Sequence, residues 1–343
     1  MRTAHHPVTA AATAAATAAL ALVPAPRAAR QPEPQPRPEF GDTGPELGLV
    51  AAARGAIRRQ LRRGHDGGSP AGSLEALAER LARQTQVPDA MGPRLARGLH
   101  VEAAHALEFA GLVYLGMGCV EPAIRVLRRA SAAYLKALDS DQPAWAERLA
   151  DLAVGSTALL AQAHAARFGE TRDEGEWAAA CELTTAAARA HSVRAAPHPE
   201  LELARALLAR GAGHPDRSLA SLDCALAGLD AREAATGAVS GSAGGELAGD
   251  LLACDRSTLD YARVFLALAD QDRAGGSPES ARLYYTVALA GFDHLHQAGF
   301  AARAHHGLAV SYRALGAQRR ASEHEQRAAE LCGALCRGDG LTG

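Results

Sequence analysis

Histidine and cysteine are the residues of this 343-residue chain that could ligate a metal or act as nucleophiles. In three close pairs of the C-terminal part, the side chains are two residues apart, adjacent, or four apart without a second pair nearby, and none of these arrangements makes a complete chelate. The histidines could still converge through packing of two elements, but ordinary surface or core positions are the interpretation that we adopt. The sequence therefore predicts no metal and no cofactor. The pairs are His294 with His296, His305 with His306, and Cys332 with Cys336.

Motifs of nucleotide-binding and hydrolytic enzymes are also missing from the sequence. The chain has a single lysine, Lys136, and no Gly-x-x-x-x-Gly-Lys-[Ser/Thr] loop that would cradle phosphates. It has no Gly-x-Ser-x-Gly elbow between a strand and a helix. No acid, base and nucleophile are recognisably placed together, so we expect that the chain is not an enzyme.

A group of arginines near the N-terminus could bind a polyanion. Arg54, Arg58 and Arg62 share one face of a helix expected over residues 46–63, where they could contact phosphate or an acidic partner. A solvated helix face is the other interpretation. The segment 73–98, with Ser73 as its expected helix cap, resembles the start of a helix-turn-helix only weakly, because Pro93 stands where the recognition helix needs an amide. A DNA-associated regulator that uses these basic helices is thus our alternative function, and nucleic acid is not the expected partner.

The elements that must position all these residues are visible as a repeat between Tyr261 and Leu335. One set of residues recurs with the same spacing further along the chain, and such self-similarity indicates stacked helical hairpins. The first copy is Leu268, Ala269, Gly276, Ala281, Tyr285 and Ala288, and the second is Leu308, Ala309, Gly316, Ala321, Glu325 and Ala328.

The same register occurs twice more, and it resembles the tetratricopeptide repeat, a hairpin of about 34 residues. Small residues allow two antiparallel helices to approach, large ones fill the space between hairpins, and glycine ends the first helix. The residues that carry the resemblance are Leu107, Gly111, Tyr114, Gly118, Ala123, Leu127 and Ala130, and then Ala206, Ala209, Gly213, Ser218, Leu222 and Ala225.

The resemblance covers residues 104–335 and implies an all-α fold, an α-α superhelix of about five tetratricopeptide-like helical hairpins. Two hairpins depart from the ideal length. One has helices expected over 143–168 and 176–191, and the other includes residues 247–275. A Gly- and Ser-rich insertion at 236–245 is expected to be a loop.

The resemblance also implies where a ligand would bind, because the first helix of each tetratricopeptide hairpin lines a concave groove that receives peptides. In the 104–137 hairpin the corresponding residues include His105, Glu108, Leu112 and Leu115, which make that part more apolar. Further along, arginine recurs at equivalent positions, which predicts a basic part that binds an acidic segment or a carboxylate-bearing ligand. Solvated arginines in an Arg-biased protein are the alternative. The candidate groove residues are Arg210, Arg263, Asp270, Arg273, Arg303, His306 and Arg313.

Composition and charge agree with an all-α scaffold. Hydrophobic residues make up 48% of the chain but aromatics only 4%, and alanine, the best helix former, supplies much of the difference. The formal net charge of −2 argues against a whole-molecule nucleic-acid or membrane binder. We divide the chain into residues 1–45, residues 46–100 as N-terminal helices that pack on the array, and residues 101–337 as the helical-repeat domain.

The N-terminal segment determines the expected location of the protein. Residues 1–45 are rich in Ala and Pro, are expected to be disordered, and form no convincing membrane span. A cytoplasmic protein is the prediction; a secreted one is the alternative if residues 1–28 are a cleaved signal peptide.

The predicted function is that of a non-enzymatic scaffold that binds a protein or peptide, in particular an acidic one. In Arg- and Ala-rich sequences of actinobacterial character, similar arrays form the partner-binding part of regulatory systems, and we expect such a role by analogy.

Overall fold

The computed structural model describes residues 45–62, 70–85, 93–138, 143–191, 196–239 and 247–338, and all regular structure in these ranges is α-helical. The predicted all-α class is confirmed. The N-terminal disorder expected for residues 1–45 falls almost entirely outside the described residues. Contacts place the described residues in one compact unit.

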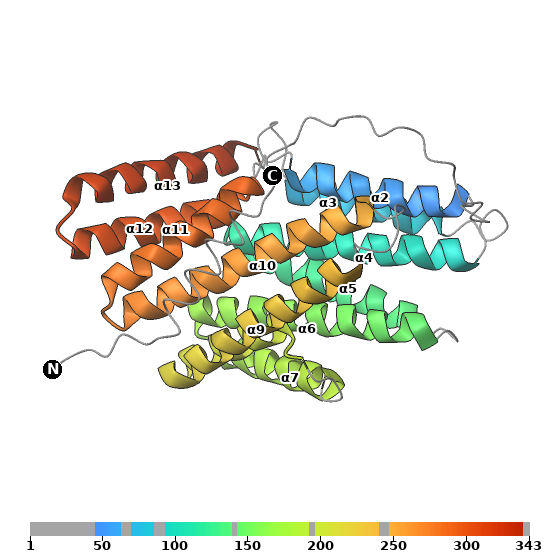
Figure 1. Ribbon diagram of the computed structural model, residues 1–343, viewed down its shortest axis with the longest axis horizontal. Helices are drawn as coiled ribbons and strands as arrows, with labels where there is room; N and C mark the ends of the chain where they lie inside the picture. Colours follow the sequence, from blue (N-terminus) through green and yellow to red (C-terminus); the bar gives the residue numbers. More distant parts are fainter. Residues whose placement is uncertain are drawn as a thin grey trace. The chain divides into compact units, whose positions relative to one another are not determined.

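Twelve helices make up the described part of the chain (Figure 1). Seven begin at a proline, whose fixed φ suits the first turn and whose missing N–H is not needed there. They are α2 (Pro45–Arg62), α3 (Pro70–Gln84), α4 (Pro93–Gly116), α5 (Val120–Leu138), α6 (Pro143–Thr171), α7 (Glu174–His191), α8 (Pro199–Gly211), α9 (Pro215–Val239), α10 (Leu247–Ala274), α11 (Pro278–His294), α12 (Ala298–Ala314) and α13 (Gln318–Gly338).

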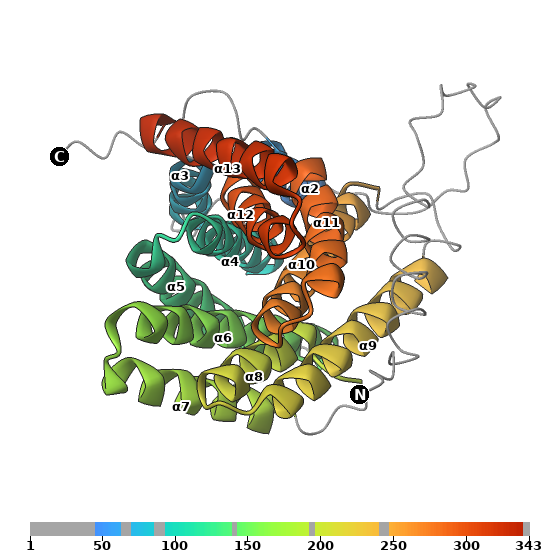
Figure 2. The ribbon, with the colours of Figure 1, turned by 90° about the vertical axis from the view of Figure 1, so that its left-hand side faces the viewer.

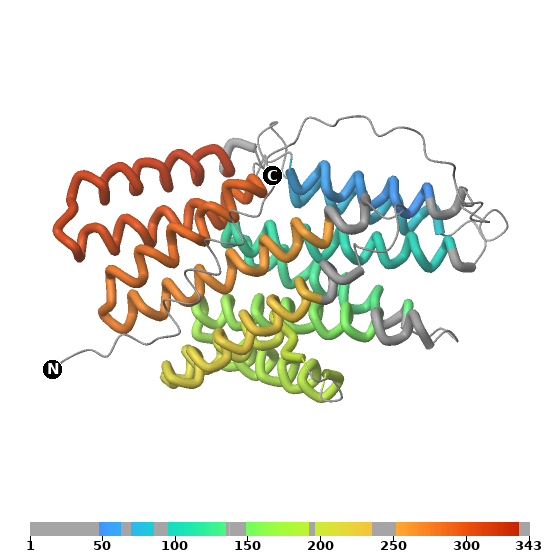
Figure 3. Tube along the Cα trace, viewed as in Figure 1, coloured from blue at the N-terminus to red at the C-terminus, as the bar shows by residue number. Residues whose placement is uncertain are grey.

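Five antiparallel pairs follow one another along the chain, and Figure 3 traces their path. The pairs α4–α5, α6–α7, α8–α9, α10–α11 and α12–α13 pack as neighbours, as the repeat predicts. Three local predictions differ from the structure. Ser73 lies inside α3, which begins at Pro70; the loop between α6 and α7 is shorter than expected; and α9 continues to Val239 before its loop.

Four of the pairs turn in the same way. Gly118, Gly213, Gly276 and Gly316 follow α4, α8, α10 and α12, each with φ between +75° and +78°. Two backbone N–H groups at each turn donate to carbonyls of the preceding helix, for example from Gly276 to Arg273 and from Ser277 to Asp272. Because glycine adopts this conformation without a Cβ penalty, the sequence register fixes where each first helix ends.

Helices far apart in the sequence also meet. α2 packs on α3, α4 and α10, and α12 packs on both α4 and α10, which lie next to it in Figure 2. At the α12–α4 contact the backbones are so close that a Cβ on Gly299 would lie 2.5 Å from the carbonyl carbon of Gly116. The first helices of the pairs therefore face a shared interior, and their inward side chains decide what that interior contains.

Candidate binding surfaces

The interior between α4, α8, α9 and α10 contains charged side chains rather than an apolar core. We call this group of three arginines and three carboxylates the central ionic network. Its members are Arg232, Arg256, Arg263, Glu108, Glu200 and Asp260. The carboxylates are at least 94% buried, and an ion at that depth is tolerated only when it is paired.

Arg256 of α10 is the centre of the network. Its three guanidinium nitrogens each contact a different carboxylate: Nη1 meets Glu108 of α4, Nη2 lies 2.9 Å from Glu200 of α8, and Nε lies 2.8 Å from Asp260. The guanidinium carbon, Cζ, lies over the Phe109 ring, 5.6 Å from the ring centroid. One side chain thus ties three helices together.

The other two arginines complete the network. Arg232 of α9 lies 3.0 Å from Glu200 and 3.4 Å from Asp260. Arg263 of α10 lies 3.2 Å from Asp260 and donates to the side-chain oxygen of Gln162. The side-chain nitrogen of Gln162 donates in turn to the backbone carbonyl of Glu200 at 2.7 Å.

Burial and charge compete in setting the protonation of this interior. Burial alone would raise the pKa of Glu200, but the charges of Arg232 and His198 outweigh it and hold that pKa well below its usual range. Burial would lower the pKa of His198, yet Glu200, 3.0 Å from its Nδ1, raises it. Burial raises the pKa of Asp260 in spite of Arg256. The opposite charges in the network therefore compensate one another.

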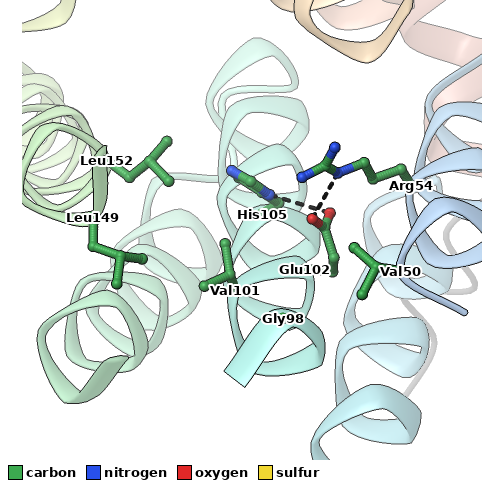
Figure 4. Close-up of a pocket in the computed structure, with 8 residues that line it drawn as sticks. All are labelled: Val50, Arg54, Gly98, Val101, Glu102, His105, Leu149 and Leu152. Carbon is green, nitrogen blue, oxygen red and sulfur yellow. Dashed lines mark hydrogen bonds and ion pairs between the residues drawn. The ribbon is translucent and has the colours of Figure 1, made fainter. Parts of the chain in front are cut away.

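The N-terminal arginines bind the array itself. On α2, Arg54 Nε donates to Glu102 of α4 at 2.8 Å, and Arg58 and Arg62 each reach Asp255 of α10 at 2.7 Å. Figure 4 shows Arg54 and His105 on either side of the Glu102 carboxylate. The hollow that Arg54, Glu102 and His105 help to line has a volume of about 20 Å³, enough for one water molecule. The four-residue spacing of these arginines lets them bind carboxylates of α4 and α10. This differs from both interpretations of the sequence, which were a surface for phosphate or an acidic partner and a solvated helix face.

A second, more open set of arginines occupies the C-terminal ends of the first helices. Arg210, Arg273 and Arg313 each precede the turn glycine by three residues, and the glycine N–H donates to their backbone carbonyls. Their side chains are 37%, 43% and 45% exposed. A cation in the last turn also complements the helix dipole. We call these three residues the edge arginines.

The partners of the edge arginines follow the repeat. Arg273 Nε donates to Tyr285 OH at 3.1 Å, and Arg313 contacts Glu325, in both cases twelve residues further along. The residue equivalent to these partners in the α8–α9 hairpin is the buried Leu222, so Arg210 turns instead to Asp270 of α10, at 3.8 Å.

Asp270 therefore lies between two edge arginines. Arg273 Nη2 is 3.9 Å from its carboxylate, and Tyr285 OH donates to it at 2.5 Å. Burial and the charge of Asp270 raise the pKa of Tyr285, which stays protonated as the donor. Two guanidiniums thus face the one carboxylate of Asp270.

The remaining predicted groove residues lie elsewhere. Arg263 is 6% exposed and belongs to the central ionic network. Arg303 and His306 are exposed on α12, where the Arg303 guanidinium lies 5.9 Å from the Phe300 ring centroid. The structure thus brings Arg210, Asp270 and Arg273 together and separates the others from them. That any of the seven binds a ligand stays a prediction.

The histidines and cysteines form no larger cluster in the described ranges. His305 and His324 meet through their Nδ1 atoms at 2.8 Å, but no group of three or more His, Cys, Asp or Glu residues there is arranged to hold a metal. No disulfide joins the cysteines whose side chains the structure describes. None of the twelve described helices combines the length and the apolar character that a bilayer crossing requires.

Apart from Glu108, which the groove assignment already named, the inward carboxylates were residues that the sequence interpretation missed. A signal for them exists: Glu102, His105 and Glu108 recur every three residues in α4, among the apolar residues of its second half. Similarly, Arg256, Asp260 and Arg263 share one face of α10. Charged residues at helical spacing among buried alanines and leucines indicate a buried polar network rather than a solvated face.

Comparisons with known proteins define what the chain resembles. No protein-family model matches the chain, and no curated protein sequence matches it. Among solved structures, the fold is similar to the crystal structure of BtubC (BKLC) from P. vanneervenii, with a TM-score of 0.41 and 14% identity. That match covers 86% of this chain and 93% of the other. A likeness at this level contributes nothing to a functional argument, so function must be argued from the contacts above.

Proposed function

We propose that the chain is a non-enzymatic helical-repeat scaffold that binds a protein or peptide through an acidic segment. The observation that carries the proposal is the row of edge arginines, which repeats along α8, α10 and α12 with more than a third of each side chain exposed. Each guanidinium has five N–H donors, and the contacts described above use only part of them.

The chemistry of these arginines fits carboxylates. A guanidinium fork pairs with a carboxylate through charge-assisted hydrogen bonds, which are stronger than neutral ones. Near Asp270, a ligand carboxylate would meet Arg210 and Arg273 on either side of a single competing anion. Two exposed guanidiniums on one carboxylate therefore favour an acidic ligand, whereas the compensated central network does not.

The finer family assignment is part of the same proposal. We infer that the hairpins are of the tetratricopeptide type, because four of them turn at a positive-φ glycine in one register. A partner-binding role in a regulatory system, in the cytoplasm, follows as the expected setting. DNA association receives no support from α2, because Arg54, Arg58 and Arg62 are paired with carboxylates of α4 and α10.

The test replaces two edge arginines and measures binding of a labelled glutamate-rich peptide. We expect the double variant Arg210→Ala, Arg273→Ala to bind the peptide about tenfold more weakly than the wild type, since two charge-assisted contacts are lost. The loss should shrink at higher salt, where both proteins bind weakly. Fluorescence anisotropy at two salt concentrations provides the measurement.

The matched control is Arg319→Ala, which removes an arginine that is 93% exposed on α13 and pairs only with its neighbour Glu323. This variant should bind like the wild type. Arg313→Ala tests whether the third edge arginine takes part. Unchanged binding by the Arg210 and Arg273 double variant would overturn the proposal.

A further inference from the structure

The surface that α2 covers differs in chemistry from the edge arginines. It is built around two carboxylates on helices far apart in the sequence, Glu102 of α4 and Asp255 of α10, which are 1% and 4% exposed. We call it the α2-binding surface. Because α2 helps to bury these carboxylates, a helix that covers them in this way must supply positive charge.

The occupant in this structure is a helix with a simple pattern. Arg54, Arg58 and Arg62 lie along one side of α2, and Ile57 and Leu61 are fully buried beside them. The arginines satisfy both carboxylates, with Arg58 and Arg62 sharing Asp255. An amphipathic helix that lays apolar and charged residues into a complementary surface is a recurring mode of peptide recognition.

The contacts of α2 are of a kind that can exchange. The three arginines remain 22%, 26% and 35% exposed, so water and salt reach their ion pairs. The Gln297 side chain also donates a hydrogen bond to the backbone carbonyl of Leu61 in α2, at 3.4 Å. Another helix with the same pattern could form the same pairs with Glu102 and Asp255.

We propose that the α2-binding surface is a recognition site for an arginine-bearing amphipathic helix of a partner protein, and that α2 occupies it in the absence of that partner. The partner helix carries arginines at four-residue spacing with aliphatic residues between them. Because α2 is tethered, its effective concentration is high, and a partner binds only by displacing it. This proposal goes beyond the one above: its ligand is basic, and its surface shares no residue with the edge arginines.

The experiment uses the full-length chain and a fluorescein-labelled peptide of residues 45–62 as the probe. The double variant Arg58→Ala, Arg62→Ala weakens the hold of α2 on Asp255, so we expect it to bind the probe at least tenfold more tightly than the wild type. Adding Asp255→Asn to that variant should abolish the gain. A probe whose three inward arginines are replaced by glutamine should not bind.

The matched control is Arg59→Ala, which removes an exposed arginine of the same helix and should leave probe affinity at the wild-type value. In the wild type, saturating unlabelled peptide should increase hydrogen exchange of the α2 amides. The proposal is overturned if the folded double variant binds no more tightly than the wild type, or if Asp255→Asn leaves its binding unchanged. If the double variant does not fold, Arg54→Ala takes its place, with Glu102→Gln as the variant that must abolish the gain.

Discussion

Two of the regions in which arginine meets carboxylate, the central ionic network and the edge, differ in burial and in charge balance. In the central ionic network, three arginines face three carboxylates that are at least 94% buried. At the edge, Arg210 and Arg273 face the single Asp270, and both are more than a third exposed. The same residue type on the same helix, α10, thus ties the fold together at Arg256 and is exposed to solvent at Arg273.

The difference shows how depth decides the role of an ion pair. A buried pair gains little over an apolar replacement, but removing one member leaves an uncompensated charge, which costs about 3–5 kcal/mol. An exposed pair is worth roughly 0–1 kcal/mol, because water and salt screen it. The interior arginines are therefore costly to replace, whereas the edge arginines can exchange partners at little cost to stability.

Replacement of Arg256 should have the largest effect. Arg256→Ala leaves Glu108, Glu200 and Asp260 with fewer cations, so we expect the free energy of unfolding to fall by about 3–5 kcal/mol. Urea unfolding followed by circular dichroism measures it. Arg319→Ala is the control and should change stability by less than about 0.5 kcal/mol. A loss below about 1 kcal/mol for Arg256→Ala would mean that water reaches the network.

The dependence of stability on pH should have opposite signs for two histidines. Glu200 raises the pKa of His198 despite burial, so its contribution is fully present below pH 6.5 and is lost as pH rises through the raised pKa. Burial, with the charges of His324 and Arg327, lowers the pKa of His305 to about 4. Its contribution is present above pH 6.5 and is lost as pH falls toward 4.

Urea unfolding across pH 4–9 tests this pair. We expect His198→Asn to flatten the alkaline side of the wild-type stability profile and His305→Asn to flatten part of the acid side. Each variant is the control for the other, because the two side chains have different partners. If both variants change the same side of the profile, the surroundings of His198 in the interior and of His305 in the α12–α13 pair do not differ electrostatically as described.

The hairpins and their turns were predictable because they are encoded locally. The register that ends at Gly276 and Gly316 specifies a helix end by backbone conformation alone, and both glycines adopt positive φ. The pairing of Arg273 with Tyr285 and of Arg313 with Glu325 also repeats within single hairpins. Contacts between neighbours in sequence leave a periodic trace that a single sequence shows.

The interior was not predictable in the same way, because it depends on contacts between distant parts of the chain. Arg263 occupies the position assigned to an open groove, yet α6, α8, α9 and α10 place it in a buried network. Likewise, the spacing of Arg58 and Arg62 indicates a basic face but not that Asp255 lies opposite it. No period in the sequence encodes that α2 packs on α10 or α12 on α4.

The smallest expected effect is on the stability of the edge variants. Arg273→Ala removes a bond to Tyr285 and a 3.9 Å contact with Asp270, but Tyr285 still donates to Asp270 and Arg210 still faces it. We expect each of Arg210→Ala and Arg273→Ala to lower the free energy of unfolding by less than about 1 kcal/mol. Urea unfolding, read beside the peptide-binding assay, separates the two roles of arginine. Loss of binding with stability kept marks a ligand surface, whereas a loss of several kcal/mol would place the edge arginines in the same structural class as Arg256.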